Sequence, residues 1–325
     1  MVHNCSYRLD GYSSNQLFSI LNQDGTKNNN PNRMLPYEKV LEILDDCKAL
    51  GVRAIQFTGG GEPTVHPQHR EVFQRVVELG FDWAMVTNGA ILRPGVPELL
   101  TRAKWIRVSL DAGTDESYSS IRRISPGSYW RTLENVRKIR QARDAAESEL
   151  VIGTGYVVTK ENWREVYEGV RNAKQAGADN MRISGMFQND DFEYFRGFYD
   201  EAAQEVERAV RELEDDSFKV FNRFTARVED LRQQNPDYEF CGHQHFTTYI
   251  GGDQNLYRCC VLAYNEKGKI GSLKDQRFID LWRSAAKQAD FAGFDARACE
   301  RCMFNDKNRA ILHQIQHPPL HAAFV

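Results

Sequence analysis

Residues 53–67, RAIQFTGGGEPTVHP, decide the fold: a short apolar run ends at three glycines, a glutamate and a proline. The run RAIQF predicts a strand that is buried on both faces, as in a parallel sheet. Glycine permits positive φ and lets the backbone approach a ligand closely. In parallel sheets and α/β barrels, ligands bind in the loops after the carboxyl ends of strands. The spacing matches neither a Walker loop nor the dinucleotide-binding fingerprint.

The same alternation of strand and helix extends on both sides of this segment. Strands are expected at 53–57, 83–87, 105–110, 149–158 and 180–185. Amphipathic helices are expected between Pro36 and Gly51, up to about 79, near 96–103, at 128–146 and near 192–215. Strands and helices in alternation build a parallel sheet or barrel through right-handed crossovers. The first strand of such a barrel is not found, and we expect it to be missing before Met1.

Length and composition restrict the class of protein. The chain has 325 residues, of which 41% are hydrophobic and 27% charged, with a net charge of −3. This composition is typical of a soluble globular protein and excludes a disordered chain. The absence of a long apolar run or a signal peptide predicts a cytoplasmic protein without a membrane partner. The acidic balance gives no support for nucleic-acid binding. The barrel pattern stops near residue 220, so we expect domains at 1–225 and 226–325.

Five of the seven cysteines lie between positions 241 and 302, which predicts metal binding rather than disulfides. Cys47 instead lies on the apolar face of an expected helix and is interpreted as a core residue. A four-ligand set of Cys241, Cys259, Cys299 and Cys302 suits zinc or an iron–sulfur cluster equally well from spacing alone. Cys260 is the alternative to Cys259.

Three segments together resemble the radical S-adenosylmethionine (radical SAM) enzymes: FTGGGEPTVHP at 57–67, VTNGA at 86–90 and VSLDAG at 108–113. The resemblance implies a partial (β/α)6 TIM-like barrel, here without its first strand. It implies that the loop contacts the amino group of S-adenosylmethionine, and that the neighbouring strand ends face the same ligand. The implied cofactor-binding residues are Gly60, Gly61, Glu62, Pro63, Asn88, Ser109 and Asp111.

The defining motif of that family, Cys-x-x-x-Cys-x-x-Cys, holds a 4Fe–4S cluster. Only Cys5 lies in the corresponding region, so we expect it to be one ligand of an incomplete set. The chain is therefore expected to be catalytically impaired, with a non-catalytic scaffold as the alternative. No catalytic residue is identified.

The segment from Cys241 to Cys302 resembles the SPASM or twitch extension of these enzymes, a small α+β domain rich in cysteine. The resemblance implies one auxiliary 4Fe–4S cluster on Cys241, Cys259, Cys299 and Cys302, with a zinc-binding α/β protein as the alternative. It further implies an electron donor such as flavodoxin or ferredoxin. The implied reaction cleaves S-adenosylmethionine reductively and takes a hydrogen atom from an unidentified substrate, a peptide or a small molecule.

Several other polar residues are interpreted as structural. His66 lies in a turn, and His243 and His245 are only secondary candidates for ligands near Cys241. Arg122 and Arg123 are expected at a solvated helix end, with an anionic substrate as the less favoured interpretation.

Overall fold

The computed structural model describes residues 8–9, 12–13, 34–186, 191–233, 235–299 and 302–317. The expectation for Cys5 therefore lies outside the described residues. The first described elements, β1 (Arg8–Leu9) and β2 (Tyr12–Ser13), pair antiparallel.

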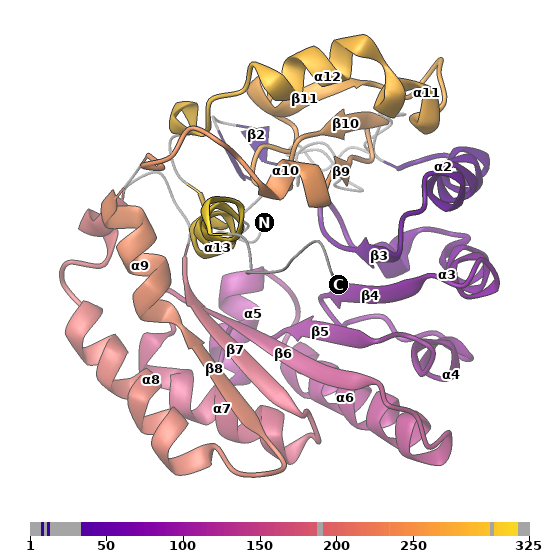
Figure 1. Ribbon diagram of the computed structural model, residues 1–325. Coiled ribbons are helices and arrows are strands. Elements are labelled where there is room, and N and C mark those ends of the chain that lie inside the picture. The colour runs from indigo at the N-terminus through magenta and orange to yellow at the C-terminus, as the bar shows by residue number, and fades with distance from the viewer. Residues whose placement is uncertain are drawn as a thin grey trace.

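The central feature is a six-stranded sheet in which every neighbouring pair is parallel and the strands follow chain order. Its strands are β3 (Ala54–Phe57), β4 (Asp82–Thr87), β5 (Trp105–Ser109), β6 (Val151–Val158), β7 (Asn180–Gly185) and β8 (Lys219–Arg223). The sheet curves, as expected for part of a barrel (Figure 1). The carboxyl ends of all six strands lie along one edge of the sheet, where a ligand would bind.

Helices cover the outer side of this sheet (Figure 1). They are α2 (Tyr37–Ala49), α3 (His69–Glu78), α4 (Val96–Leu100), α6 (Ser128–Ala145), α7 (Val166–Gln175), α8 (Tyr199–Leu213) and α9 (Phe224–Gln233). The helix α5 (Asp115–Arg122) instead follows the carboxyl end of β5 and packs against α6. Strand β5 shows why they pack there. Ile106 and Val108 are buried, whereas the alternate residues Trp105, Arg107 and Ser109 are half-buried. Apolar residues on one face of the strand are thus covered by helices, and the opposite, interior face stays partly accessible.

Aromatic side chains fill the core between β3, β4 and α3. Phe73 of α3 lies 4.9 Å from Phe57 and stacks on Trp83 at 5.1 Å between ring centroids. Phe73 and Trp83 are each 1% exposed. This packing fixes the start of the Gly-rich loop, because Phe57 is the last residue of β3.

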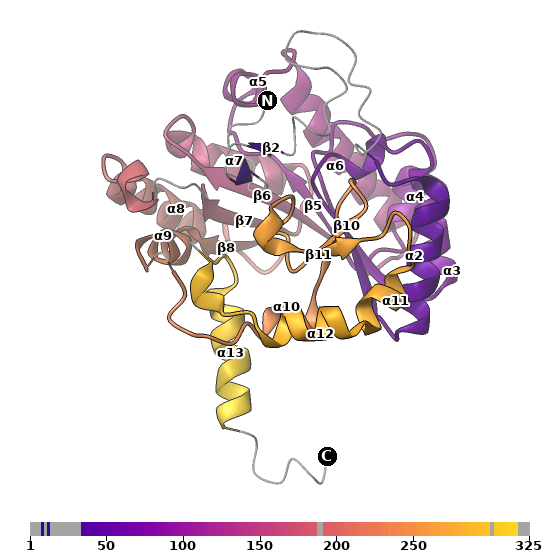
Figure 2. The same cartoon turned by 90° about the horizontal axis from the view of Figure 1, so that it is seen from above.

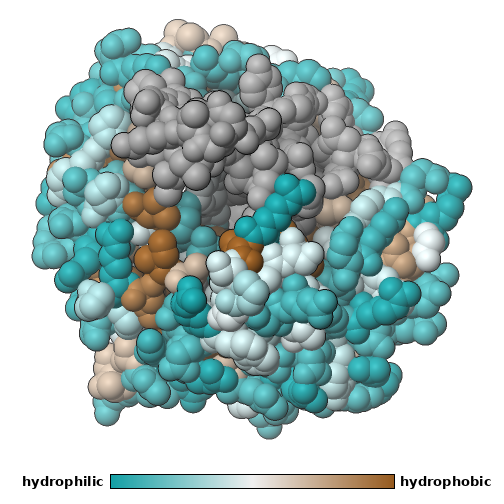
Figure 3. Space-filling view, turned by 180° about the vertical axis from the view of Figure 1, so that it is seen from behind, coloured by the Kyte–Doolittle hydropathy of each residue, from teal (hydrophilic) through white to brown (hydrophobic). Residues whose placement is uncertain are grey.

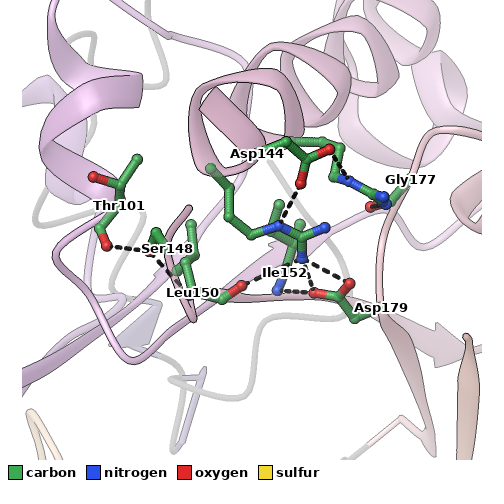
Figure 4. A network of polar contacts seen from close by, with 9 residues as sticks. Thr101, Asp144, Ser148, Leu150, Ile152, Gly177 and Asp179 are labelled. Atoms are coloured by element: carbon green, nitrogen blue, oxygen red, sulfur yellow. Dashed lines mark hydrogen bonds and ion pairs between the residues drawn. The ribbon is translucent and has the colours of Figure 1, made fainter. Parts of the chain in front are cut away.

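A polar network ties α6 to the starts of β6 and β7 (Figure 4). Arg143 of α6 donates to both carboxylate oxygens of Asp179, at 2.7 Å each, and to the Leu150 carbonyl at 3.3 Å. Asp179 also accepts from the backbone N–H of Ile152 at 2.7 Å. This network holds the amino-terminal ends of two strands, far from the edge where a ligand would bind.

The C-terminal part contains a small antiparallel sheet in the order β11-β10-β9. The elements of the C-terminal part are α10 (His243–Phe246), β9 (Tyr249–Ile250), β10 (Asn255–Tyr257), β11 (Lys269–Ser272), α11 (Phe278–Arg283), α12 (Ala285–Ala292) and α13 (Asn305–Gln316). These elements lie across the open side of the curved sheet, and α11 lies beside α2 (Figures 1 and 2). The small α+β fold expected for the cysteine-rich part is therefore present.

A buried carboxylate connects the two parts. Asp46 of α2 is fully buried and accepts from the Arg277 guanidinium and from the backbone N–H of Ile279 at 3.2 Å. Arg277 is the residue before α11, so this contact holds the start of that helix against the barrel.

The surface seen from behind is mainly hydrophilic, with apolar side chains in a small patch (Figure 3). Among the described residues, no helix has the length and apolar character needed to cross a membrane.

The expected α/β class with a partial barrel is confirmed, and the five expected strands are present. The sixth strand, Lys219–Arg223, was not expected, because only Val220 in it is buried. The single helix expected near 192–215 is wrong in its first part, where a 3-10 turn at Asp191–Tyr194 precedes α8.

Candidate functional site

The Gly-rich loop lies directly after β3, at the carboxyl edge of the sheet. Gly60 has φ +111°, a conformation that side chains other than glycine rarely adopt. A Cβ at this position would overlap the hydroxyl of Tyr264. The glycine is therefore required both by the backbone conformation and by the close approach of another part of the chain.

The Glu62 carboxylate fixes this loop to the end of the neighbouring strand. Its Oε1 accepts from the backbone N–H and hydroxyl of Thr64, at 3.2 and 2.9 Å, and from the Thr87 hydroxyl at 2.7 Å. Its Oε2 accepts from the backbone N–H of Asn88 at 2.7 Å. The carboxylate thus positions the loop, with Pro63 beginning the short turn that follows. Contact of Gly60, Gly61, Glu62 and Pro63 with a cofactor stays a prediction.

The other expected ligand contacts lie at the ends of β4 and β5. Asn88 follows β4 and uses its Oδ1 to accept from Ala90 N–H at 2.8 Å. Ser109 ends β5 on its half-buried interior face. Asp111 has φ +52° and accepts from Val157 N–H at 2.9 Å and from Arg122 at 2.8 Å. Because both carboxylate oxygens of Asp111 have partners, its geometry favours the turn role over direct contact with a ligand.

Arg122 is not at a solvated helix end, and that expectation is wrong. Its side chain is 9% exposed and pairs with Asp111, and it also donates to the Ser109 carbonyl at 2.9 Å. Arg122 therefore holds the last residue of β5, Ser109, and the turn residue Asp111 that follows the strand. The next residue, Arg123, closes α5 in a left-handed conformation.

Two tyrosines of the C-terminal part contact the Gly-rich loop, and no local sequence pattern predicts this contact. The Tyr249 hydroxyl donates to the Gly59 carbonyl. It lies 3.1 Å from the Tyr264 hydroxyl, to which the backbone N–H of Gly252 also donates at 3.3 Å. These side chains bring the cysteine-rich part of the chain directly onto the expected cofactor-binding loop.

The C-terminal cysteines form the second part of the site. Burial, and then the charge of Cys302, raises the pKa of Cys260 to about 11, and burial with Cys302 and Cys241 raises that of Cys299 to about 12. Burial followed by Cys260 raises the pKa of Cys259 as well. A metal ion stabilises the thiolate form of its cysteine ligands, and soft thiolates suit iron.

The surroundings of Cys302 support a ligand role. Its Sγ accepts from the backbone N–H of Phe304 at 3.3 Å. Hydrogen bonds to sulfur are one way in which proteins tune iron–sulfur clusters. Within the described ranges, no three His, Cys, Asp or Glu side chains converge as the ligands of a single metal ion do. The choice between Cys259 and Cys260 stays a prediction.

The histidines near the two parts of the site have structural roles. His66 contacts the Leu35 carbonyl at 3.0 Å. His243 stacks on Phe304 at 3.9 Å between centroids, and burial, with Lys307, lowers its pKa to about 4. His245 stacks on Phe240. Cys47 is buried in the core, as expected.

A large surface hollow of about 710 Å³ lies away from this site. It is lined by residues of α3, α4 and the end of α6, among them Arg70, Glu98 and Ser148. Because it opens on the helix-covered side, it has no part in the site at the strand ends.

Two family models match the chain. The Radical SAM superfamily matches residues 5–171, and SPASM, an iron–sulfur cluster-binding domain, matches residues 241–303. The first match covers the Gly-rich loop and strands β3 to β6, and the second covers the cysteine cluster. The iron–sulfur interpretation of that cluster is therefore confirmed over zinc.

Curated relatives align with about half of the chain. One is the tungsten-containing aldehyde ferredoxin oxidoreductase cofactor-modifying protein of Pyrococcus furiosus, 30% identical over 157 residues, which are 47% of this chain and 43% of the relative. Another is the AdoMet-dependent heme synthase of Methanosarcina barkeri, 28% identical over 44% of this chain and 40% of the relative. The chain thus spans less than half the length of these relatives.

Solved structures share the fold. SuiB of Streptococcus suis bound to the precursor peptide SuiA superposes with a TM-score of 0.57 at 15% identity, over 83% of this chain and 61% of that one. The enzyme anSMEcpe with bound AdoMet and a peptide gives 0.55 at 14% identity, over 79% and 75%. At this identity the likeness shows the architecture alone.

Proposed function

The chain belongs to the radical SAM superfamily of enzymes, and from that premise we propose that it cleaves S-adenosylmethionine reductively and takes a hydrogen atom from a substrate. The observation that carries the proposal is the Gly-rich loop at the strand ends, which Glu62 fixes to β4. A radical SAM domain binds S-adenosylmethionine and a 4Fe–4S cluster, and a SPASM domain binds auxiliary clusters. Cluster chemistry supplies the electron that breaks the sulfonium bond.

The residues of this chain would position the cofactor and exclude water from the site. The proposed cofactor contacts are Gly60, Gly61, Glu62, Pro63, Asn88 and Ser109, whereas Asp111, also expected from the sequence, is proposed to hold the turn after β5. Glu62 and Arg122 act by holding the loop and the end of β5, as their hydrogen bonds indicate. The C-terminal part lies over the open side of the sheet and would keep water from a reactive intermediate (Figure 2).

The auxiliary cluster is proposed to bind to Cys241, Cys259, Cys299 and Cys302. All four cysteines are half-buried and lie in the segment that the SPASM model matches, which supports them as a metal-binding set. A flavodoxin or ferredoxin would supply the electrons. The relatives include a cofactor-modifying protein and a peptide cyclase, which supports a cofactor precursor or a peptide as the substrate.

The test is anaerobic reconstitution with iron and sulfide, reduction with dithionite, and quantification of 5′-deoxyadenosine and methionine. We expect both products in equal amounts but at a low rate, because Cys5 alone stands for the three cysteines of the family motif. Glu62→Gln should weaken S-adenosylmethionine binding because it removes the charge that accepts hydrogen bonds from Thr87 and Asn88. Glu98→Gln, on the remote surface hollow, is the matched control.

Iron counting on the same samples tests the auxiliary site. Cys302→Ala should lose about four irons per chain, whereas Cys47→Ala should lose none. A fully iron-loaded chain that binds no S-adenosylmethionine and forms no 5′-deoxyadenosine would contradict the proposed function.

A further inference from the structure

Two arginines lie on the interior face of the sheet, on the strands that flank β6. In β5, Arg107 alternates with buried Ile106 and Val108, and in β7, Arg182 alternates with buried Met181 and Ile183. Both arginine side chains are only half-buried. They therefore point away from the helices and into the partly accessible inside of the barrel.

The strand between them presents glycines to the arginine side chains. The interior positions of β6 include Gly153 and Gly155, and the register pairs Arg107 with Gly153 and Arg182 with Gly155. A Cβ added to Gly155 would lie 3.3 Å from Cδ of Arg107. The aliphatic part of Arg107 thus lies over Gly155, so the guanidinium extends across β6, the strand that separates it from Arg182.

These arginines differ from the well-buried arginines elsewhere in the protein, each of which contacts a carboxylate. The buried pairs are Arg122–Asp111, Arg143–Asp179, Arg227–Asp230 and Arg258–Asp290. In the described part of the chain, neither Arg107 nor Arg182 has a hydrogen bond or an ion pair to a side chain or carbonyl. The Arg107 guanidinium lies over the Trp105 ring, 5.2 Å from its centroid. This cation–π contact leaves the N–H groups of the guanidinium as strong donors for an anion.

The charges of the two side chains reinforce this interpretation. Burial, and then the charge of Arg182, lowers the pKa of Arg107 to about 10. Burial, and then Arg223, lowers the pKa of Arg182. Arg223 itself pairs with Asp306, so its charge is already compensated. An anion between Arg107 and Arg182 would offset both burial and repulsion.

We propose that Arg107 and Arg182, separated by Gly155, form a binding site for an anionic group of the substrate, a carboxylate or a phosphate. The site lies below the strand ends, so an anion held there would place the rest of the substrate toward the Gly-rich loop. This assignment to the substrate rests on the proposed function, whereas anion binding itself does not.

The experiment titrates inorganic phosphate, and separately succinate, into the cluster-loaded chain by anaerobic calorimetry at constant ionic strength. The variants are Arg107→Met and Arg182→Met. Arg211→Met, on the exposed side of α8 with its partner Glu212 also on the surface, is the matched control. We expect saturable binding in the wild type and control, and affinity at least about tenfold weaker in either interior variant. The preferred anion identifies the group as phosphate or carboxylate.

Arg182→Lys serves as a second variant should a Met variant fail to fold, and it is expected to bind the anion more weakly than arginine because lysine lacks the planar fork. Equal affinity in the wild type, Arg107→Met and Arg182→Met would overturn the site. Displacement of phosphate by S-adenosylmethionine would overturn its assignment to the substrate. Phosphate binding in a chain that forms no 5′-deoxyadenosine would support the site and contradict the proposed function.

Discussion

Asp46 offers a direct test of how the C-terminal part is held on the barrel. Its side chain is 1% exposed and accepts from the Arg277 guanidinium and from the Ile279 N–H. The substitution Asp46→Asn keeps the shape of the side chain but removes its charge. The NH₂ group of asparagine cannot accept a hydrogen bond. Losing a hydrogen bond to a charged group costs about 1.5–3 kcal/mol, so the free energy of unfolding should fall by about 2 kcal/mol.

The assay is urea unfolding followed by circular dichroism, with limited proteolysis of the native protein to detect release of the C-terminal part. The neighbouring carboxylate provides the control. Asp45 is 48% exposed and pairs with Arg75 at 2.8 Å, and Asp45→Asn should be nearly neutral because exposed pairs contribute little.

The double variant Asp46→Asn/Arg277→Gln tests whether the two residues act as a pair. Its effect should be smaller than the sum of the single effects, because the second change removes a partner that is already lost. Equal destabilisation by Asp45→Asn and Asp46→Asn would refute the reasoning, since burial is what distinguishes the two residues.

Three further changes test other parts of the structure. Gly60→Ala should weaken S-adenosylmethionine binding by about tenfold or more, because alanine is strained in this backbone conformation and its Cβ would overlap Tyr264. Gly127→Ala is the control, because Gly127 also has positive φ but its Cβ would meet no atom within 4 Å, and its binding should not change. Calorimetric titration measures both variants. Asp179→Asn should lower the free energy of unfolding in urea by about 2 kcal/mol, because it weakens the contacts that hold β6 and β7, and an unchanged midpoint would contradict this. Burial, and then Asp46, raises the pKa of Cys47 to about 12, above that of the unfolded thiol. The contribution of the neutral Cys47 thiol to stability is therefore complete below about pH 8.5 and is lost as the pH rises toward 12. Peptide mapping should show that Cys47 in the native protein is not modified by iodoacetamide at pH 8.

The sequence predicted those parts of the fold that have a strong apolar pattern. Strands β4 and β6 are mainly apolar, and β5 and β7 alternate apolar with polar residues, because helices bury one face and the barrel interior only partly buries the other. The sixth strand has only Val220 buried, so its sequence resembles a polar loop. Edge strands of this kind carry little periodic signal.

The candidate site was predictable only at its loop motifs and cysteines. Contacts between distant residues leave no local pattern, and the hydroxyl of Tyr249 meets Gly59 across 190 positions of sequence. The pairing of Arg122 with Asp111 also leaves no local pattern, so the sequence alone does not distinguish this buried arginine from a solvated one. Arg107 was counted as part of a strand, and only the register of β5 to β7 shows what it faces.

The tyrosine contact on the Gly-rich loop has a thermodynamic consequence. Tyr249 and Tyr264 belong to the cysteine-rich part, and Gly59 and Gly60 belong to the loop expected to hold S-adenosylmethionine. Two binding events that change the stability of one shared contact are linked, and the linkage is reciprocal. If loading of the auxiliary cluster strengthens this contact, the affinity for S-adenosylmethionine must change by the same factor by which S-adenosylmethionine changes retention of the cluster.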